Sequence, residues 1–298
     1  MSYPNSEQTY RALMKLDFMV VFEIFMTPAA AIADIVLPVA TGLEHETVGY
    51  WPGWYEEIRM YPKVIDPPGE ARPDTHIINE LAKRLVLKED FFDGEAEAWD
   101  LMLKPSALSF EDFKRKRVLH AKREYDKYKF PTGSGKVEIY SKQLEELGYS
   151  PMPRWEELLR PSELSNEYPL LMTNDKEKAY LLTGYKMISA LRNMKPEPMV
   201  WLSPETAGEI GLSEGDTVYI ETKTGRIKQR LGLDPDLDPR VVFVDYGWWF
   251  PEDGPSSLYG WRKSNINIIV GSSELPCDPV TGSLQLRGIP CRVYRAQD

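Results

Sequence analysis

Residues 201–249 read WLSPETAGEIGLSEGDTVYIETKTGRIKQRLGLDPDLDPRVVFVDYGWW. This stretch predicts the fold of the chain more clearly than any other. Ser203 is a favourable N-cap, and Pro204 fits the first helical position, where its missing N–H leaves no intrahelical bond unmade. Gly211 is typical of the residue that follows a helix. The stretch therefore begins with a predicted short helix, capped at Ser203 and ended by Gly211.

Strands are predicted after this helix. Val218 and Ile220 alternate with polar neighbours, which indicates a strand with one buried face. A Thr-Gly turn leads into a second strand at residues 226–231, so the two strands form a hairpin. Residues 241–244 (VVFV) are apolar on both faces, as expected of a strand inside a sandwich or a closed barrel. The aromatic sequence Gly247-Trp248-Trp249 follows.

This series of motifs resembles the C-terminal domain of the molybdopterin oxidoreductases, the dimethyl sulfoxide reductase family. The resemblance extends over residues 166–298. It implies a six-stranded, double-psi-like β-barrel at residues 151–298 that clamps the nucleotide arm of a molybdopterin guanine dinucleotide. The motifs that carry it are Leu202–Ala207, Gly211-Leu212, Gly215–Val218, Gly247–Trp249, Ser264–Asn267, Asp278-Pro279, Gly282 and Pro290–Val293.

Residues 1–150 have a different pattern. A helix at residues 6–15, an apolar strand at 18–22, a short helix from Thr27 and a strand at 34–38 follow in close succession. This alternation is typical of the edge of a parallel α/β sheet. So few strands do not bury both faces of a sheet, so the sequence predicts a truncated parallel α/β lobe, with a helical insertion between residues 91 and 110.

The same family resemblance covers this lobe, through Leu16–Phe18, Phe25–Ala30, Ala33–Pro38, Pro68–Arg72 and a helix at residues 75–87. Within that helix Ile77, Leu81 and Leu85 are spaced every four residues and are expected to face the sheet. The resemblance implies that the family's N-terminal half, with its iron–sulfur cysteines and molybdenum ligand, lies outside this sequence. The expected partner is that missing half or a catalytic subunit, with self-association through the truncated lobe as another possibility.

Composition narrows the class of protein. The chain has 298 residues, 42% of them hydrophobic, and a formal net charge of −10. This charge argues against nucleic-acid binding, which needs a basic surface. No apolar run approaches the ~20 residues of a membrane span, and residues 1–16 lack the pattern of a secretory signal. We therefore expect no membrane insertion and a cytoplasmic protein, or a periplasmic one if an export signal lies on the missing part.

The expected cofactor site lies around residues 170–192. An apolar strand, residues 170–172, ends in polar residues, and loops at strand ends present hydroxyl, amide and backbone groups to ligands. A predicted strand at residues 265–268 places two asparagine amides on one face. The expected cofactor is the bis form of molybdopterin guanine dinucleotide, with molybdenum or tungsten in the complete enzyme. The expected cofactor-binding residues are Thr173, Asn174, Asp175, Thr183, Tyr185, Lys186, Trp248, Asn265 and Asn267.

Two departures from the family pattern leave a second function open. The family usually has Gly-Arg in the first loop, where this chain has Asn174-Asp175, and His-Ser-x-x-Arg in the second, where this chain has Thr183-Gly184-Tyr185-Lys186. A lysine does not reproduce the bidentate contact of an arginine. The alternative to a cofactor-clamping part of an oxidoreductase is therefore a non-catalytic binding or assembly module that kept the barrel but lost tight cofactor binding.

No catalytic or metal-binding residue is predicted. The histidines His45, His76 and His120 are far apart in sequence, and none has the spacing of a metal site or a catalytic triad. Cys291 lies in a terminal strand and is expected to be a small buried hydrophobic residue. Chemistry would belong to the molybdenum centre, with the protein supplying orientation and electrostatics.

Overall fold

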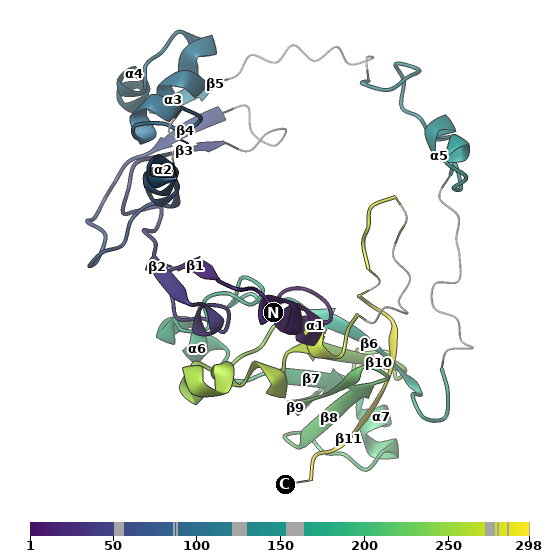
Figure 1. Ribbon diagram of the computed structural model, residues 1–298. Helices are drawn as coiled ribbons and strands as arrows, with labels where there is room; N and C mark the ends of the chain where they lie inside the picture. Colours follow the sequence, from purple (N-terminus) through teal and green to yellow (C-terminus); the bar gives the residue numbers. More distant parts are fainter. Residues whose placement is uncertain are drawn as a thin grey trace. The chain divides into compact units, whose positions relative to one another are not determined.

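A computed structural model describes residues 1–50, 57–85, 87, 89–120, 130–152, 164–271, 278, 280–284 and 286–297, except for the side chains of Tyr50 and Asp175. The chain forms two compact units (Figure 1). One contains Met1–Leu37 together with Leu159–Asp298, and the other contains Pro38–Leu158. The first 37 residues thus pack with the C-terminal part of the chain. The division predicted at residues 150 and 151 stays a prediction.

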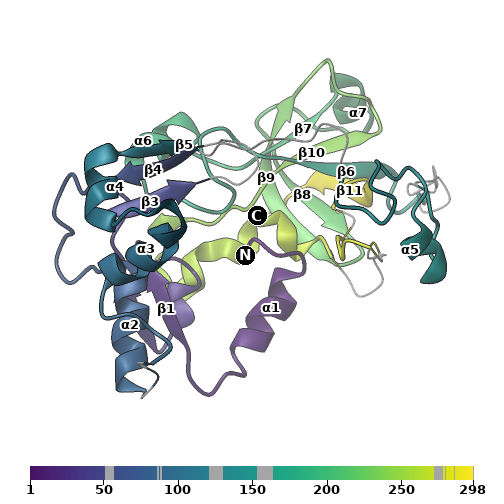
Figure 2. The same cartoon turned by 90° about the horizontal axis from the view of Figure 1, so that it is seen from above.

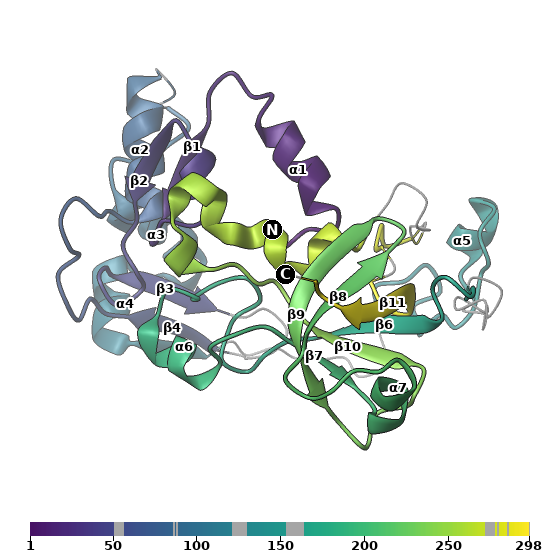
Figure 3. The same ribbon diagram turned by 90° about the horizontal axis from the view of Figure 1, so that it is seen from below.

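The first unit is built on a closed, six-stranded barrel, which confirms the predicted fold class (Figure 3). The strand order around the barrel is β10-β6-β11-β8-β9-β7. The β10–β6 and β7–β9 pairs are parallel, and the β8–β9 hairpin is antiparallel, so the barrel is mixed. The strands are β6 (Leu170–Asp175), β7 (Met199–Leu202), β8 (Thr217–Thr222), β9 (Gly225–Leu233), β10 (Val241–Asp245) and β11 (Ile289–Arg295).

Alternating apolar residues fill the interior of this barrel. Val218 and Ile220 of β8 are completely buried, as their spacing predicts, and Val242 and Val244 of the apolar strand β10 are buried as well. Cys291 of β11 is also fully buried, and burial raises the pKa of its thiol above the usual range. The prediction of a small buried residue at Cys291 is confirmed, whereas Cys277 lies outside the described residues.

Short helices surround the barrel. The predicted capped helix is α7 (Pro204–Glu209), where the Ser203 side chain accepts a hydrogen bond from the Thr206 N–H. Gly211 has a φ of 70°, the left-handed conformation expected after a helix. The remaining helical segments here are α6 (Ser189–Met194), η4 (Pro251–Asp253), η5 (Pro255–Lys263) and η6 (Ile266–Ile268). The strand predicted at residues 265–268 is therefore wrong: Asn265 is the N-cap of a 3-10 turn and accepts from the Asn267 N–H.

The N-terminal segment of the first unit contains α1 (Ser6–Leu13), β1 (Val20–Glu23), η1 (Ala30–Ile32) and β2 (Ile35–Pro38). The order of elements matches the sequence pattern, and β1 and β2 form a two-stranded sheet (Figure 1). Large apolar side chains on and beside this sheet remain exposed, including Phe18 at 60% and Ile24 at 46%. The sheet has two strands, as few as the prediction of a truncated lobe implies.

The second unit contains a three-stranded sheet that the sequence did not reveal. Its strands are β3 (Thr47–Tyr50), β4 (Glu57–Tyr61) and β5 (Val118–His120), in that order. Its helical segments are α2 (Asp74–Arg84), α3 (Glu95–Leu103), η2 (Lys104–Ser106), α4 (Phe110–Lys116) and α5 (Lys142–Glu146), most of which are labelled in Figure 2.

The helix predicted at residues 75–87 is confirmed as α2, but its buried face is different from the predicted one. Leu81 and Leu85 are 49% and 59% exposed, whereas Asn79 and Ala82 are buried. The four-residue spacing of large apolar side chains identified the helix correctly. The face that packs within this unit is the neighbouring one, which carries Asn79 and Ala82.

Candidate functional site

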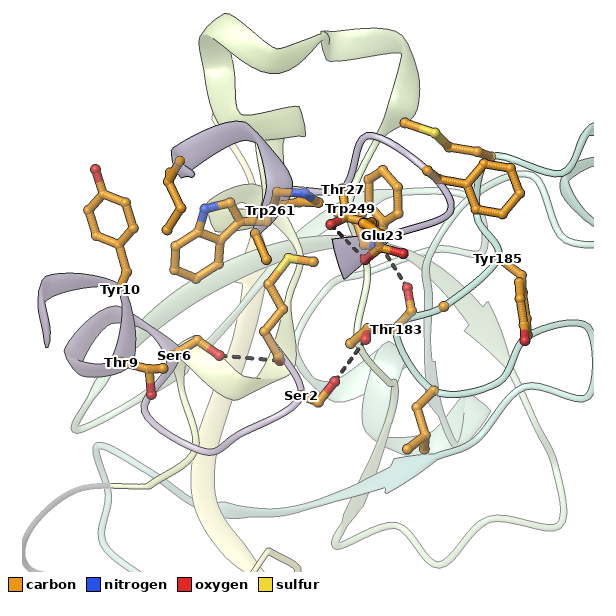
Figure 4. Close-up of a pocket in the computed structure, with 18 of the residues that line it drawn as sticks. Ser2, Ser6, Thr9, Tyr10, Glu23, Thr27, Thr183, Tyr185, Trp249 and Trp261 are labelled. Atoms are coloured by element: carbon orange, nitrogen blue, oxygen red, sulfur yellow. Dashed lines mark hydrogen bonds between the residues drawn. The ribbon is translucent and has the colours of Figure 1, made fainter. Parts of the chain in front are cut away.

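A cavity of about 490 Å³ opens in the first unit beside the loop at residues 181–187 (Figure 4). α1 and the segment from Glu23 to Ile32 form one side of it, and the rings of Trp249 and Trp261 form another. Most of its lining is apolar or aromatic, with hydroxyl groups such as that of Thr183 among them. Glu23 adds a carboxylate to the lining. A mostly apolar cavity of this size, with some polar groups, suits an organic ligand.

The loop on the cavity wall is held in a strained conformation. Leu182 and Tyr185 have φ values of 54° and 67°, which bulky residues rarely adopt. Thr183 is fixed between them, because its hydroxyl lies 2.8 Å from the Ser2 hydroxyl and its carbonyl accepts from Trp249 Nε1 at 2.7 Å. Strain held by surrounding contacts is a feature of ligand-binding loops.

Lys186 belongs to the same loop but lies in a buried cluster behind the cavity wall. Its side chain is completely buried, with Nζ 3.9 Å from the centre of the Tyr180 ring and 4.6 Å from that of Trp248. The Arg192 guanidinium lies 5.3 Å from the same Trp248 ring. Burial, reinforced by the positive charge of Arg192, lowers the pKa of Lys186 to about 7.

Asp245, at the end of β10, completes the cluster. One carboxylate oxygen accepts from the Met199 N–H at 2.7 Å and pairs with Lys195 Nζ at 3.0 Å. Lys195 also pairs with Glu177 at 2.9 Å. Complete burial raises the pKa of Asp245 to about 7, although Lys195 acts in the opposite direction.

Several buried polar atoms in this cluster have no hydrogen-bond partner within the described part of the chain. They are Lys186 Nζ, Arg192 Nη1, Trp248 Nε1 and Asp245 Oδ1. A buried polar group without a partner costs about 1–3 kcal/mol. Three donors at the Trp248 ring and one acceptor, on Asp245, mark a place where a polar ligand would satisfy groups that the described part of the protein leaves unpaired.

The sequence-predicted site residues fall into separate places. Thr183 and Tyr185 line the cavity, while Lys186 and Trp248 lie in the buried cluster. Thr173 and Asn174 are on β6, and Asn174 Nδ2 donates to the Leu286 carbonyl at 3.1 Å. The side chain of Asp175 lies outside the described part of the structure.

Asn265 and Asn267 are both buried, and both amides donate to the carbonyl of Met1, at 3.3 and 2.7 Å. Asn267 also donates to the Tyr246 hydroxyl at 3.1 Å. Met1 lines the cavity. The two amides therefore hold the segment that forms one edge of the cavity.

Sequence reasoning missed Tyr180, Asp245 and Trp261. Asp245 follows a fully apolar strand, and a carboxylate in that position is a signal of a buried charge. Trp261 lies in a segment with no periodic pattern, so only the folded chain brings it next to α1, where its ring is 6.2 Å from that of Tyr10.

Two family models match the chain. The model of the molydopterin dinucleotide binding domain matches residues 170–290, and the model of molybdopterin oxidoreductase matches residues 1–84. The first match spans nearly the whole barrel, and the second includes the β1–β2 sheet. Together they include Thr183, Lys186 and Trp248 of the site described above.

Longer relatives match over nearly the whole chain. Acetylene hydratase of Syntrophotalea acetylenica is 32% identical over 314 residues, covering 99% of this chain and 42% of the hydratase. A probable oxidoreductase of Bacillus subtilis (strain 168) is 29% identical, covering 92% of this chain and 42% of the relative. The solved structure of acetylene hydratase from Pelobacter acetylenicus superposes with a TM-score of 0.87 at 31% identity, over 99% of this chain and 42% of that one.

The chain therefore belongs to the molybdopterin oxidoreductase family, also called the dimethyl sulfoxide reductase family, and carries its dinucleotide-binding domain. It spans about two-fifths of the length of these relatives. Within the described ranges no three His, Cys, Asp or Glu side chains group in a way that could hold a metal ion. Over the same ranges, no helix is long and apolar enough to cross a membrane.

The residues present fit a cofactor of this class. The unpartnered donors of Lys186, Arg192 and Trp248 are of the kind that phosphate oxygens satisfy. The unpartnered Asp245 oxygen is an acceptor of the kind that the N–H groups of a purine or pterin satisfy. When bound, such a cofactor would supply the redox or Lewis-acid chemistry of its metal.

Proposed function

We propose that this chain is the cofactor-clamping part of a molybdenum or tungsten oxidoreductase, and that it binds the guanine dinucleotide arm of the cofactor. The observation that carries the proposal is the buried cluster of Lys186, Arg192, Trp248 and Asp245, where four buried polar atoms lack partners within the described residues. The family membership supplies the ligand class, and the cluster supplies groups that an anionic arm requires.

The nine expected residues enter the proposal in four groups. Thr183 and Tyr185 contact the cofactor from the cavity wall, and Thr173, Asn174 and Asp175 contact it from the end of β6. Lys186 and Trp248 bind the phosphates, and Asn265 and Asn267 position the Met1 segment at the cavity edge. This grouping follows the places of the described side chains, and Asp175 is included from its position at the end of β6.

Movement of the strained loop is part of this proposal. Lys186 is completely buried, so a ligand reaches its ammonium group only when residues 181–187 shift. The left-handed conformations of Leu182 and Tyr185 favour such a shift, because each costs on the order of 1–3 kcal/mol that a new conformation can release.

Catalysis, in this proposal, needs the portion of the relatives that this chain does not span. Exposed apolar side chains gather at Met14, Leu16, Phe18 and Val20, with exposures between 41% and 60%. An apolar patch of this kind marks an interaction surface. We assign it to the remaining polypeptide of the enzyme. In the chain alone it drives self-association, which sedimentation of wild type and a Leu16→Glu/Phe18→Glu variant would measure.

A non-catalytic binding or assembly module is the second candidate. The loop sequence Asn174-Asp175-Lys176 favours it, because the arginine usual in the family is absent there. In that case the barrel would fold without measurable affinity for the nucleotide arm.

Calorimetry with guanosine diphosphate separates the two functions. The wild-type chain should bind guanosine diphosphate more tightly than cytidine diphosphate. Trp248→Phe keeps an aromatic ring but removes the unpartnered N–H, and it should weaken binding by about 1.5–3 kcal/mol. Trp201→Phe on β7 is the matched control and should bind like wild type. Absence of binding by wild type supports the assembly module, and undiminished binding by Trp248→Phe removes this cluster from the site.

A further inference from the structure

A second cavity, of about 480 Å³, lies on the outside of the barrel, between the β8–β9 hairpin and η5. It shares no lining residue with the cavity beside the strained loop. Its walls carry five cationic side chains and a single carboxylate, that of Glu197. We call it the basic groove, and its cations are Arg226, Lys228, Arg230, Arg262 and Lys263.

The strand β9 arranges three of these cations. Arg226, Lys228 and Arg230 alternate along β9, so they lie on one face of the hairpin. Lys228 is directly opposite Tyr219 of β8 in the strand register. Such a column of like charges is unfavourable without a counter-charge. It is also unexpected in a chain with a net charge of −10.

Three of the five cations have a carboxylate partner. Arg230 pairs with Glu197 at 2.9 Å. The other two pairs reach outside the groove lining: Arg262 with Glu7 at 2.8 Å, and Lys263 with Asp253 at 2.7 Å. Exposed pairs of this kind contribute little, so they do not account for the placement of the cations.

The remaining two cations have no carboxylate at ion-pair distance within the described ranges. The Lys228 ammonium lies 5.1 Å from the Tyr219 ring centre, and the Arg226 guanidinium lies 4.4 Å from it. Arg226 donates to the Tyr294 hydroxyl at 3.3 Å. Glu221 lies opposite Arg226 in the strand register, but it pairs with Arg292 at 2.7 Å, so most of the positive charge of Arg226 and Lys228 is left for a ligand.

We propose that the basic groove docks an acidic segment of a partner protein. Carboxylates would complete the pairing of Arg226 and Lys228, and the charge would steer the partner toward this face of the barrel. A nucleotide fits less well, because cations already lie over the rings of Tyr219 and Phe250, where a base would stack.

The groove lies next to the cofactor cavity along the chain. Trp249 lines the cavity and Phe250 the groove, and Trp261 and Arg262 divide in the same way. Residues 249–262 therefore contribute to the walls of both the groove and the cavity. The docking proposal does not rest on the cofactor, since its residues and its test are independent of Lys186 and Trp248.

Fluorescence anisotropy of a labelled hexaglutamate peptide tests the proposal on the full chain. The peptide should bind wild type in low salt and be released as the salt concentration rises. Arg226→Gln/Lys228→Gln should weaken binding about tenfold or more, and Lys228→Gln alone should give part of this loss. Lys223→Gln is the matched control, because Lys223 is an exposed cation on the turn of the same hairpin and does not line the groove.

The outcomes decide clearly. Binding lost in the double variant and kept in Lys223→Gln supports docking. Equal loss in Lys223→Gln, or no binding by wild type, overturns it. Binding of inorganic tripolyphosphate without binding of the peptide also overturns it, and assigns the groove to a phosphate compound. Guanosine diphosphate binding should be the same in all these variants, so failure of the docking proposal is separate from failure of the proposed function.

Discussion

The barrel and the β1–β2 sheet belong to the same compact unit, yet they bury their apolar residues to very different degrees. Barrel residues such as Val218, Leu231 and Val244 are completely buried. Beside the β1–β2 sheet, Leu16 and Phe18 are 55% and 60% exposed. Residues 16–38 are at least as apolar as the barrel strands, so the difference arises from closure. A barrel leaves no open edge, and a two-stranded sheet leaves both.

This contrast separates what the chain does alone from what it does in a complex. A closed barrel has a core of its own and can present a ligand site on its loops. The β1–β2 sheet gains stability only when other elements cover it. We therefore expect substitutions in the two regions to differ most in the stability of the isolated chain.

Leu231→Ala should have the largest effect. Leu231 is fully buried in the barrel core, so its truncation should lower the free energy of unfolding by about 2–5 kcal/mol. Urea denaturation followed by circular dichroism measures this loss. A cost below about 1 kcal/mol would mean that the barrel is not the stabilising core of the chain.

Lys186→Met should raise the free energy of unfolding rather than lower it. It replaces a buried charge that has no hydrogen-bond partner in the described structure with an apolar side chain of similar length, and should raise stability at pH 7 by about 1–4 kcal/mol. Lys178→Met, an exposed lysine of the preceding loop, is the control and should change little. Affinity for guanosine diphosphate should fall in Lys186→Met only. A destabilised Lys186→Met chain would contradict the account.

The pH dependence of stability should follow from the same cluster. The pKa of Lys186 is lowered to about 7, so between pH 7 and its ordinary pKa the unfolded chain binds a proton that the folded chain does not, and stability rises with pH. The pKa of Asp245 is raised to about 7, so its contribution falls as pH rises from its ordinary value to 7. Lys186→Met should remove the rise and Asp245→Asn the fall, as denaturation at several pH values would show.

Ser203→Ala should have a smaller effect. The Ser203 side chain caps α7 at 3.1 Å from the Thr206 N–H, and its loss should cost about 1 kcal/mol. Thermal denaturation measures the change. Ser203→Asp, which keeps a capping oxygen, should restore most of the stability, and failure to do so would argue that burial of Ser203 matters more than capping.

Phe18→Ala should have the smallest effect on the isolated chain. Phe18 is 60% exposed, so truncation should change the free energy of unfolding by no more than about 0.5 kcal/mol. The same substitution should reduce self-association seen by sedimentation. A large loss of stability would mean that the β1–β2 sheet is already covered in the isolated chain.

The sequence was most informative where local patterns decide the structure. Ser203, Pro204 and Gly211 define α7, and the alternation at Val218 and Ile220 defines a barrel strand, because caps and strand periodicity act over a few residues. The pattern at residues 264–268 misled, because Asn265 caps a 3-10 turn through its own side chain. Alternating polar and apolar residues do not distinguish such a turn from a strand.

The candidate site was predicted only in part, because its residues meet through tertiary contacts. Thr183, Tyr185 and Lys186 were found as polar residues of one loop. Thr183 and Tyr185 line the cavity and Lys186 lies in the buried cluster, and this division depends on the positive φ values of the loop. No sequence pattern pairs Tyr180 with Lys186, since they meet within one irregular loop, or Asp245 with Lys195, which come from β10 and the end of α6.

In the proposed function this chain clamps a cofactor whose metal ligand lies on another part of the enzyme. Elemental analysis of the purified chain, produced in a host that makes the molybdenum cofactor, tests it most directly. The chain alone should hold far less than one molybdenum or tungsten atom per molecule. Stoichiometric metal in the isolated chain would contradict it.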